Sequence, residues 1–176
     1  MRRSLVALGS SLLAAVASLP AQETADGRGS QFLDPLLDHL VGDWHVTRRF
    51  GSGRTAQNTV HAEWVLNHQF LELHYLDVAT PPKYEAMVFI GYDNTQKRYV
   101  CHWIDVFGGG FSGLAEGTSD EAGRAIEFVF NYPAGKFTNR FTYDPATQSW
   151  TSLMRQEAKG KWKLFAEDKF TVAARK

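Results

Sequence analysis

From residue 42 onward, apolar and polar side chains alternate in short runs, and turn-forming residues separate these runs about every ten positions. Such alternation is typical of β-strands that bury one face, because successive side chains of a strand point to opposite sides. The pattern therefore predicts about ten strands. They are expected at residues 44–50, 55–66, 70–78, 84–92, 98–107, 111–118, 124–132, 136–143, 149–157 and 161–172.

The connections between these strands are short, which favours an antiparallel meander. A meander of this length has two exposed edge strands unless it closes on itself, and closure into a barrel removes them. We therefore expect an all-β fold, a closed antiparallel up-and-down barrel. A two-sheet sandwich is the structural alternative.

A short amphipathic helix is predicted over residues 32–41, before the first strand. Asp34 and Pro35 suit its N-cap and first turn, and Gly42 suits its end. Its apolar stripe needs a surface to cover, and the mouth or floor of a barrel would provide one. The apolar positions at helical spacing are Leu33, Leu36, Leu37 and Leu40.

The N-terminus has the layout of a secretory signal peptide over residues 1–21. Two arginines precede an apolar stretch at 5–19, and a cleavage site is expected after Ala21. The stretch is short for a membrane span and no second one follows, so we expect no membrane span after its removal. Residues 22–31 are expected to form a flexible leader and 32–176 a single domain, located in the periplasm or secreted.

Charge and cysteine content narrow the classes of partner. Removal of residues 1–21 would remove two arginines and no acidic residue, which leaves 17 basic and 19 acidic residues. This balance gives no footprint for nucleic acid and no polybasic patch for anionic lipid. Cys101 is the one cysteine of the chain, so no internal disulfide forms, and its apolar surroundings predict a buried, unreactive thiol.

The two strands at 84–92 and 98–107 are apolar on both faces, which is unusual for a barrel wall exposed to water. Part of the outer wall is therefore expected to be covered, either by the N-terminal helix or by a partner subunit. A homodimer would provide such a cover.

The sequence contains no specific catalytic signature, and we name no catalytic residue and no cofactor. A nucleophile elbow, a P-loop and a dinucleotide fingerprint are all missing from it. Gly108-Gly109-Gly110 lies between two predicted strands and lacks the following helix that a phosphate site requires. We interpret it as a wide hairpin at the barrel rim.

Polar residues within otherwise apolar strands are the better candidates for ligand contacts, because a few polar groups orient a ligand in an apolar cavity. The competing interpretation is that they face water or pair across strands. Three histidines within strands could also converge on a metal ion, although no ligand spacing supports this. They are His61, His74 and His102. The candidate ligand-binding residues are His74, His102, Trp103, Asp105 and Arg140.

Several short motifs together resemble one protein family. They are Leu40-Val41-Gly42-Asp43-Trp44, Gly91-Tyr92-Asp93-Asn94, Lys97-Arg98-Tyr99-Val100, Trp103-Ile104-Asp105 and Gly117-Thr118-Ser119-Asp120. Over residues 33–172 the chain resembles exported bacterial proteins of unknown function that are placed among the lipocalin-like (calycin) barrels. The resemblance implies a closed barrel of about ten strands without established activity. It gives structural roles to Gly42, Trp44, Tyr92 and Asp93, with Trp44 at the closed end under a basic side chain such as Lys169 or Arg155.

The leading hypothesis is a non-enzymatic, exported barrel that holds a small apolar or amphipathic molecule. A second hypothesis is an enzyme that uses His102 and Asp105 as acid and base, but residues three apart in a strand point to opposite faces. A third is a haem- or metal-binding barrel, with His74 or His102 as axial ligand. A fourth is a structural module that binds another protein through its outer faces.

Overall fold

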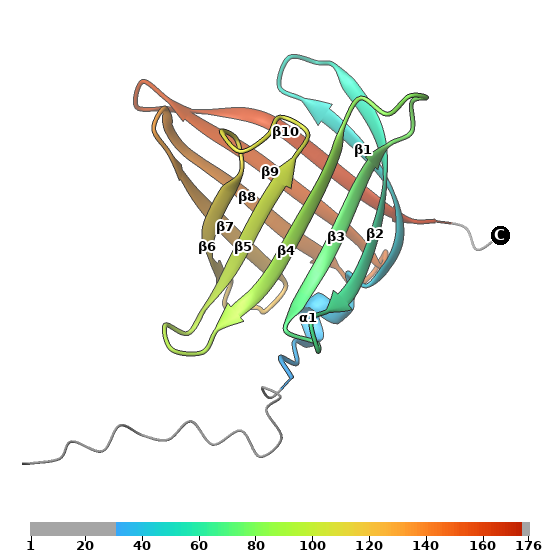
Figure 1. The fold of residues 1–176 in the computed structure, drawn as a ribbon, viewed down its shortest axis with the longest axis vertical. Coiled ribbons are helices and arrows are strands. Elements are labelled where there is room, and N and C mark those ends of the chain that lie inside the picture. Colours follow the sequence, from blue (N-terminus) through green and yellow to red (C-terminus); the bar gives the residue numbers. More distant parts are fainter. Residues whose placement is uncertain (1–30, 174–176) are drawn as a thin grey trace, which may run out of the picture.

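The computed structural model describes residues 31–173, which form one short helix and ten β-strands. All ten strand pairs are antiparallel, and the strands close into a barrel because β1 pairs with both β2 and β10 (Figure 1). This confirms the predicted up-and-down barrel and excludes the sandwich. The elements are α1 Pro35–Asp38, β1 Gly42–Phe50, β2 Thr55–Val65, β3 Phe70–Asp77, β4 Glu85–Asp93, β5 Arg98–Asp105, β6 Gly113–Ser119, β7 Ala125–Tyr132, β8 Gly135–Asp144, β9 Ser149–Ala158 and β10 Lys161–Val172.

The period of two along each strand decides which side chains enter the interior. In β1, Trp44, Val46 and Arg48 are buried, and the residues between them are exposed. No predicted strand end differs from the observed one by more than two residues. The hydrophobic pattern therefore defined both the strands and their inner faces.

The helix is shorter than predicted, since α1 covers only Pro35–Asp38 within the expected range 32–41. Asp34 caps it, because its carboxylate accepts hydrogen bonds from the amides of Leu36 and Leu37 at 2.9 and 3.0 Å. After Asp38 the chain tightens into i→i+3 turns and enters β1 directly at Gly42, whose φ of +128° suits glycine. The prediction that Gly42 ends a longer helix is therefore wrong.

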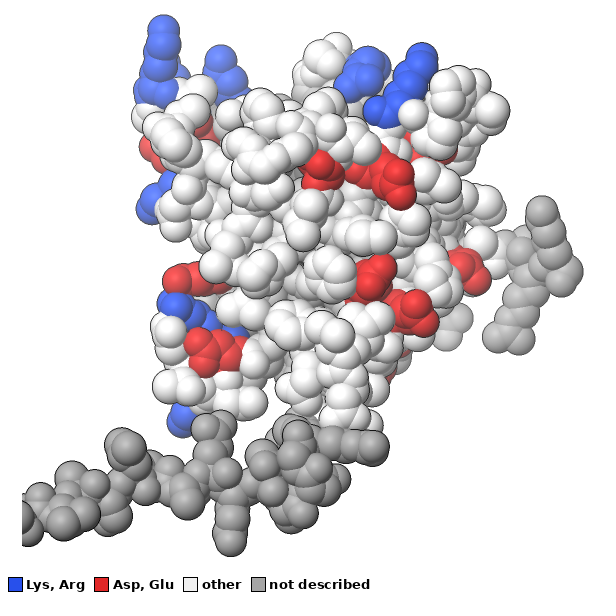
Figure 2. All heavy atoms as spheres, in the orientation of Figure 1, with Lys and Arg blue, Asp and Glu red and all other residues white. Residues whose placement is uncertain are grey.

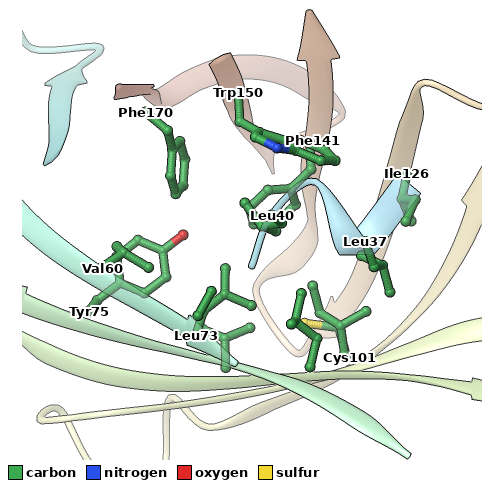
Figure 3. Packing of buried hydrophobic residues seen from close by; sticks show 14 of the residues in the cluster. Leu37, Leu40, Val60, Leu73, Tyr75, Cys101, Ile126, Phe141, Trp150 and Phe170 are labelled. Carbon is green, nitrogen blue, oxygen red and sulfur yellow. The ribbon is translucent and has the colours of Figure 1, made fainter. Parts of the chain in front are cut away.

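The segment around α1 closes one end of the barrel. Leu37 and Leu40 are almost fully buried, which stabilises the fold by roughly 1.5–3 kcal/mol for each side chain. Figure 3 shows Leu40 between Trp150 on one wall and Leu73 on the other. The apolar stripe therefore covers the floor of the barrel, one of the two surfaces expected for it.

Two indoles hold the turn that follows α1. Trp44 donates a hydrogen bond from Nε1 to the Leu40 carbonyl oxygen at 2.8 Å, and Trp150 donates to the His39 carbonyl oxygen at 3.1 Å. These bonds satisfy carbonyl groups that the short helix leaves free. Trp44 is 5% exposed and lies at the closed end, where its ring packs edge-on against Phe170.

Neither of the two late-strand basic residues named for this role covers the tryptophan, in contrast to the arrangement that the resemblance implied. Lys169 follows the inward-facing Asp168 in β10, and Arg155 follows the inward-facing Met154 in β9. Both basic residues are exposed on the outer wall, because neighbouring residues of a strand face opposite ways.

The outer wall of β4, β5 and β6 is not covered by the helix. α1 lies at the end of the barrel (Figure 1), and the apolar side chains of Met87, Ile104 and Leu114 are 42%, 49% and 62% exposed. The helix is therefore the wrong cover for this wall. A homodimer that covers it stays a prediction.

Most of the N-terminal predictions fall outside the described part of the chain. The signal peptide at residues 1–21 and nearly all of the leader at 22–31 precede residue 31. Between residues 31 and 173, the structure has no helix with the length and apolar character needed to span a lipid bilayer.

Candidate functional site

A cavity of about 750 Å³ opens at the end of the barrel opposite α1. All five hairpins of this end contribute to it, and its volume lies in the usual range for small-molecule sites. Aromatic side chains dominate its lining, so a bound molecule would be largely removed from water. They are Phe50, Tyr84, Trp103, Phe107, Phe111, Phe130, Tyr132, Phe137 and Phe165.

The aromatic rings support one another around the cavity. Phe137 packs edge-on against both Phe130 and Phe165, with ring centroids 6.1 and 5.3 Å apart. Phe107 packs against Phe111 at 6.2 Å, and these two rings are 63% and 65% exposed. The inner part of the lining is therefore fixed by packing, whereas the rim presents aromatic surface to solvent.

A buried ion pair lies at the base of the cavity. Arg48 of β1 lines the cavity and donates hydrogen bonds from Nε and Nη2 to both carboxylate oxygens of Asp168 in β10, each at 2.7 Å. Arg48 is 5% exposed and Asp168 is fully buried. Burial raises the pKa of Asp168 above its ordinary value, while the hydrogen bonds from Arg48 oppose this shift. The pair brings no net charge to the cavity.

Two tyrosine rings face the guanidinium, and a tryptophan contacts one of them. The Arg48 Cζ atom lies 5.4 Å from the centroid of the Tyr84 ring and 5.9 Å from that of Tyr75, within cation–π range. Trp103 donates from Nε1 to the Tyr84 hydroxyl at 3.2 Å. Burial raises the pKa of Tyr84, although nearby Arg48 acts in the opposite direction, so this hydroxyl stays protonated at neutral pH.

Asn58 provides an unused hydrogen-bond acceptor in the cavity. It lies on the inner face of β2, is 2% exposed, and no group of the described chain donates to its Oδ1 atom. By contrast, the Asn139 Oδ1 atom on the other wall accepts a hydrogen bond from Ser152 at 2.6 Å. An unmet buried acceptor costs about 1–3 kcal/mol, and a ligand that donates to Asn58 would recover part of this.

The carboxylates at the rim are occupied by the backbone of their own turns. Asp105 accepts from the Phe107 amide at 3.0 Å. Asp77 accepts from the amides of Ala79 and Lys83 at 3.1 and 3.2 Å. These hydrogen bonds shape the turns at the mouth and use only part of the acceptor capacity of each carboxylate.

The structure divides the five candidate ligand-binding residues between the two sides of the wall. Trp103 and Asp105 line the cavity. His74 lies on the outer face, with Nε2 at 2.8 Å from Glu85 Oε1. His102 is exposed on the outer face as well, because its neighbour Trp103 points inward.

Arg140 also lies outside the barrel, where it pairs with Asp120 at 3.1 Å and Glu127 at 3.7 Å. A molecule in the cavity could not touch Arg140, His74 or His102. The positions of these three residues agree with the competing interpretation, in which polar groups of strands face water or pair across strands.

Neither the histidine metal site nor the His102–Asp105 acid–base pair, both considered from the sequence, is formed by the described residues. His61 contacts Asp43 at 2.7 Å on the outer surface, apart from the His74–Glu85 contact, so the strand histidines do not converge inside the barrel. Within residues 31–173, no three His, Cys, Asp or Glu side chains are placed to hold a metal ion. His102 and Asp105 lie on opposite faces of β5, which separates the acid–base pair of the enzyme hypothesis.

The residues given structural roles occupy turns and the closed end. Tyr92 stacks on Phe32 with ring centroids 5.5 Å apart. Asp93 accepts hydrogen bonds from the amides of Thr95 and Gln96 at 2.9 and 3.0 Å, and so closes the turn between β4 and β5. Gly42 and Trp44 join α1 to the barrel.

Sequence reasoning missed the cavity residues Arg48 and Asn58, and also Asp168. Each of them lies two residues from a buried apolar residue of the same strand, and this spacing can be read from the sequence. Arg48 shares a face with Trp44, and Asp168 shares one with Phe170. A charged residue in phase with buried apolar neighbours predicts a buried charge that needs a partner.

A second, smaller hollow of about 410 Å³ lies at the closed end, around the outside of the β1 entry. It is lined by residues such as Asp38, Gly42 and Val172, and His39 stacks on Tyr143 beside it at 4.4 Å. It lacks the aromatic enclosure of the cavity at the mouth.

Comparison of the chain with known protein families gives one match. A family model described as "Protein of unknown function (DUF1579)" matches residues 34–172. A search of curated proteins gave no match. Among solved structures, a redesigned β-barrel is similar with 14% identity and a TM-score of 0.37, over 82% of this chain and 100% of that one.

Proposed function

Since the chain belongs to this family of unknown function, we propose from its cavity that the protein binds a small apolar or amphipathic molecule inside the barrel. The observation that carries the proposal is the aromatic cavity of about 750 Å³ above a polar base. Burial of ligand surface against the aromatic lining would supply most of the affinity.

The polar base would orient the ligand. The Asn58 Oδ1 atom calls for a hydrogen-bond donor, and the Tyr84 hydroxyl borders the same region. Because Asp168 already neutralises Arg48, a charged head group would find no free counter-ion at the base. The proposed ligand therefore has a neutral polar end that enters first and an apolar body that fills the mouth.

Two further parts of the proposal concern family and location. We infer that the barrel is lipocalin-like in the wider calycin sense, supported by the opening at Gly42-Asp43-Trp44 and by the ten-stranded closure. We also infer that it is exported to the periplasm or secreted, supported by the signal-peptide layout of residues 1–21.

Titration with the fluorescent hydrophobic probe N-phenyl-1-naphthylamine tests the binding proposal. We expect a saturable rise in probe fluorescence with the wild-type protein. Ala56 lines the cavity, and Ala56→Phe would fill part of it, so probe affinity should fall at least about tenfold, which corresponds to about 1.4 kcal/mol. Gln57→Phe adds the same ring to the outer face of β2 and is the matched control.

The outcomes separate cavity binding from surface binding. Probe binding that Ala56→Phe weakens and Gln57→Phe leaves intact would support the proposal. Equal probe affinity in the wild type and Ala56→Phe, with both proteins folded by circular dichroism, would overturn it. Mass spectrometry of the native protein, purified from its source, would then identify a molecule that copurifies with it.

A further inference from the structure

Exposed apolar side chains gather around the cavity mouth. They lie on the β3–β4 and β5–β6 connections and at the start of β10, and each is between 46% and 65% exposed. Such surface is costly in water unless something covers it. The side chains are Val78, Val106, Phe107, Phe111, Trp162 and Leu164.

The same end of the barrel carries positive charge. The five connections of the mouth contain Arg54, Lys83 and Lys159 and no acidic residue. The strand ends that flank them add four basic residues, Arg49, Lys136, Lys161 and Lys163, and four acidic ones, Asp77, Glu85, Asp105 and Glu157, so the mouth keeps a net positive charge. In Figure 2, basic side chains project at both upper corners, which is the mouth end in Figure 1. Lys159, Lys161 and Lys163 belong to one hairpin, and the closed barrel brings Arg54 and Lys83 from two other hairpins to the same end.

At the closed end of the barrel, acidic residues outnumber basic ones in the described chain. Residues 32–41 and the four closed-end turns contain Asp34, Asp38, Asp120 and Glu121 against Lys97 and Arg124. Apolar side chains such as Leu33 and Leu66 are exposed there as well. Apolar exposure alone therefore does not single out the mouth, but its combination with positive charge does.

We propose that the mouth end docks on an anionic lipid surface. Aromatic side chains favour the interface between headgroups and acyl chains, and lysines near a bilayer are attracted by anionic lipids. Phe107 and Phe111 belong both to this surface and to the cavity rim. Docking would turn the open cavity toward the bilayer, and entry of an amphipathic molecule by this route rests on the proposed function.

Co-sedimentation with lipid vesicles tests the docking. The processed, exported protein is mixed with vesicles of 30 mol% phosphatidylglycerol in phosphatidylcholine, or with pure phosphatidylcholine. We expect stronger binding to the anionic vesicles, reduced by added salt. Lys161→Gln/Lys163→Gln should weaken this binding about 30-fold, because each lysine near the surface contributes roughly a fivefold factor.

A matched variant removes two cations from the closed end. Lys97→Asn/Arg124→Gln should bind as the wild type does, and Asn suits position 97 because its φ is +53°. Trp162→Ser should weaken binding severalfold without changing the charge. Equal binding to both vesicles, no binding, or equal losses in the two charge variants would overturn the proposal.

The probe titration keeps this inference separate from the proposed function. Neither Lys161 nor Lys163 lines the cavity, so their double variant should bind N-phenyl-1-naphthylamine as the wild type does in the absence of vesicles. Probe binding without vesicle binding would reject the docking alone. Vesicle binding without probe binding would reject the proposed function and retain the docking surface.

Discussion

Replacing Asp168 with Asn would leave the Arg48 guanidinium buried without its carboxylate partner. The two hydrogen bonds of this pair are both 2.7 Å long, and its members are 5% and 0% exposed. Loss of one member of such a pair costs about 3–5 kcal/mol, because the remaining charge stays desolvated. We expect the free energy of unfolding to fall by this amount, a large share of the roughly 5–15 kcal/mol of a typical domain.

The reverse change, Arg48→Met, adds a dependence on pH. Without Arg48, burial alone acts on Asp168 and holds the pKa of its carboxyl group above the ordinary value. A carboxyl group whose pKa is higher in the folded protein than in the unfolded chain contributes stability to the fold. This contribution is complete at pH values below the unfolded-state pKa of about 3.9, and it is lost as the pH rises through the folded-state pKa. The destabilisation by Arg48→Met should therefore be smaller at pH 5 than at pH 7.

Urea unfolding, followed by circular dichroism at both pH values, measures these effects. Arg48→Met/Asp168→Leu removes both charges and should be less destabilised than either single variant, because no unpaired charge remains. Arg49→Met breaks the exposed neighbouring pair with Glu167 and should cost less than about 1 kcal/mol. An Asp168→Asn variant that lost no more stability than Arg49→Met would refute the buried-charge explanation.

Three substitutions and one labelling experiment test the surroundings of the core. Asp34→Ala removes both the cap of α1 and the acceptor of the Tyr99 hydroxyl at 2.5 Å, so the unfolding free energy should fall by about 1–3 kcal/mol in urea. Burial and Asp34 raise the pKa of Tyr99, so the wild type should lose stability above about pH 10 and Tyr99→Phe should lose less of it. Burial raises the pKa of Cys101, so Ellman's reagent should react only on unfolding, and rapid native labelling would contradict its burial. Gly117→Ala would place a Cβ atom 2.5 Å from the Phe128 ring and should cost about 1–3 kcal/mol in the same urea assay, whereas an unchanged midpoint would mean that the ring moves freely.

The strands and their inner faces were predictable because each was encoded locally. Trp44 and Val46 mark the inner face of β1 with the same period that marks Val60 and Ala62 on β2. The helix end was not encoded in this way. Whether the chain after Asp38 continues as a helix or turns depends on the indoles that bind the turn carbonyls, one of them 111 residues away.

The candidate site was predictable only in part, for the same reason. Trp103 and Asp105 face the cavity, and strand parity then forces His102 outward, a constraint that the sequence already contained. The partner of Arg48 could not be identified from sequence, since Asp168 lies 120 residues away and approaches only when β10 closes on β1.

The composition of the inner positions indicates that the cavity is not a packing defect. At the closed end these positions hold large side chains such as Trp150 and Phe170, which fill the barrel. Toward the mouth they include Ala56, Asn58 and Asn139, although larger apolar residues would fit the same strand phase and bury more surface. The two buried asparagines at this end therefore cost stability that apolar side chains would supply, and departures from local packing rules are expected where a protein keeps space for a function.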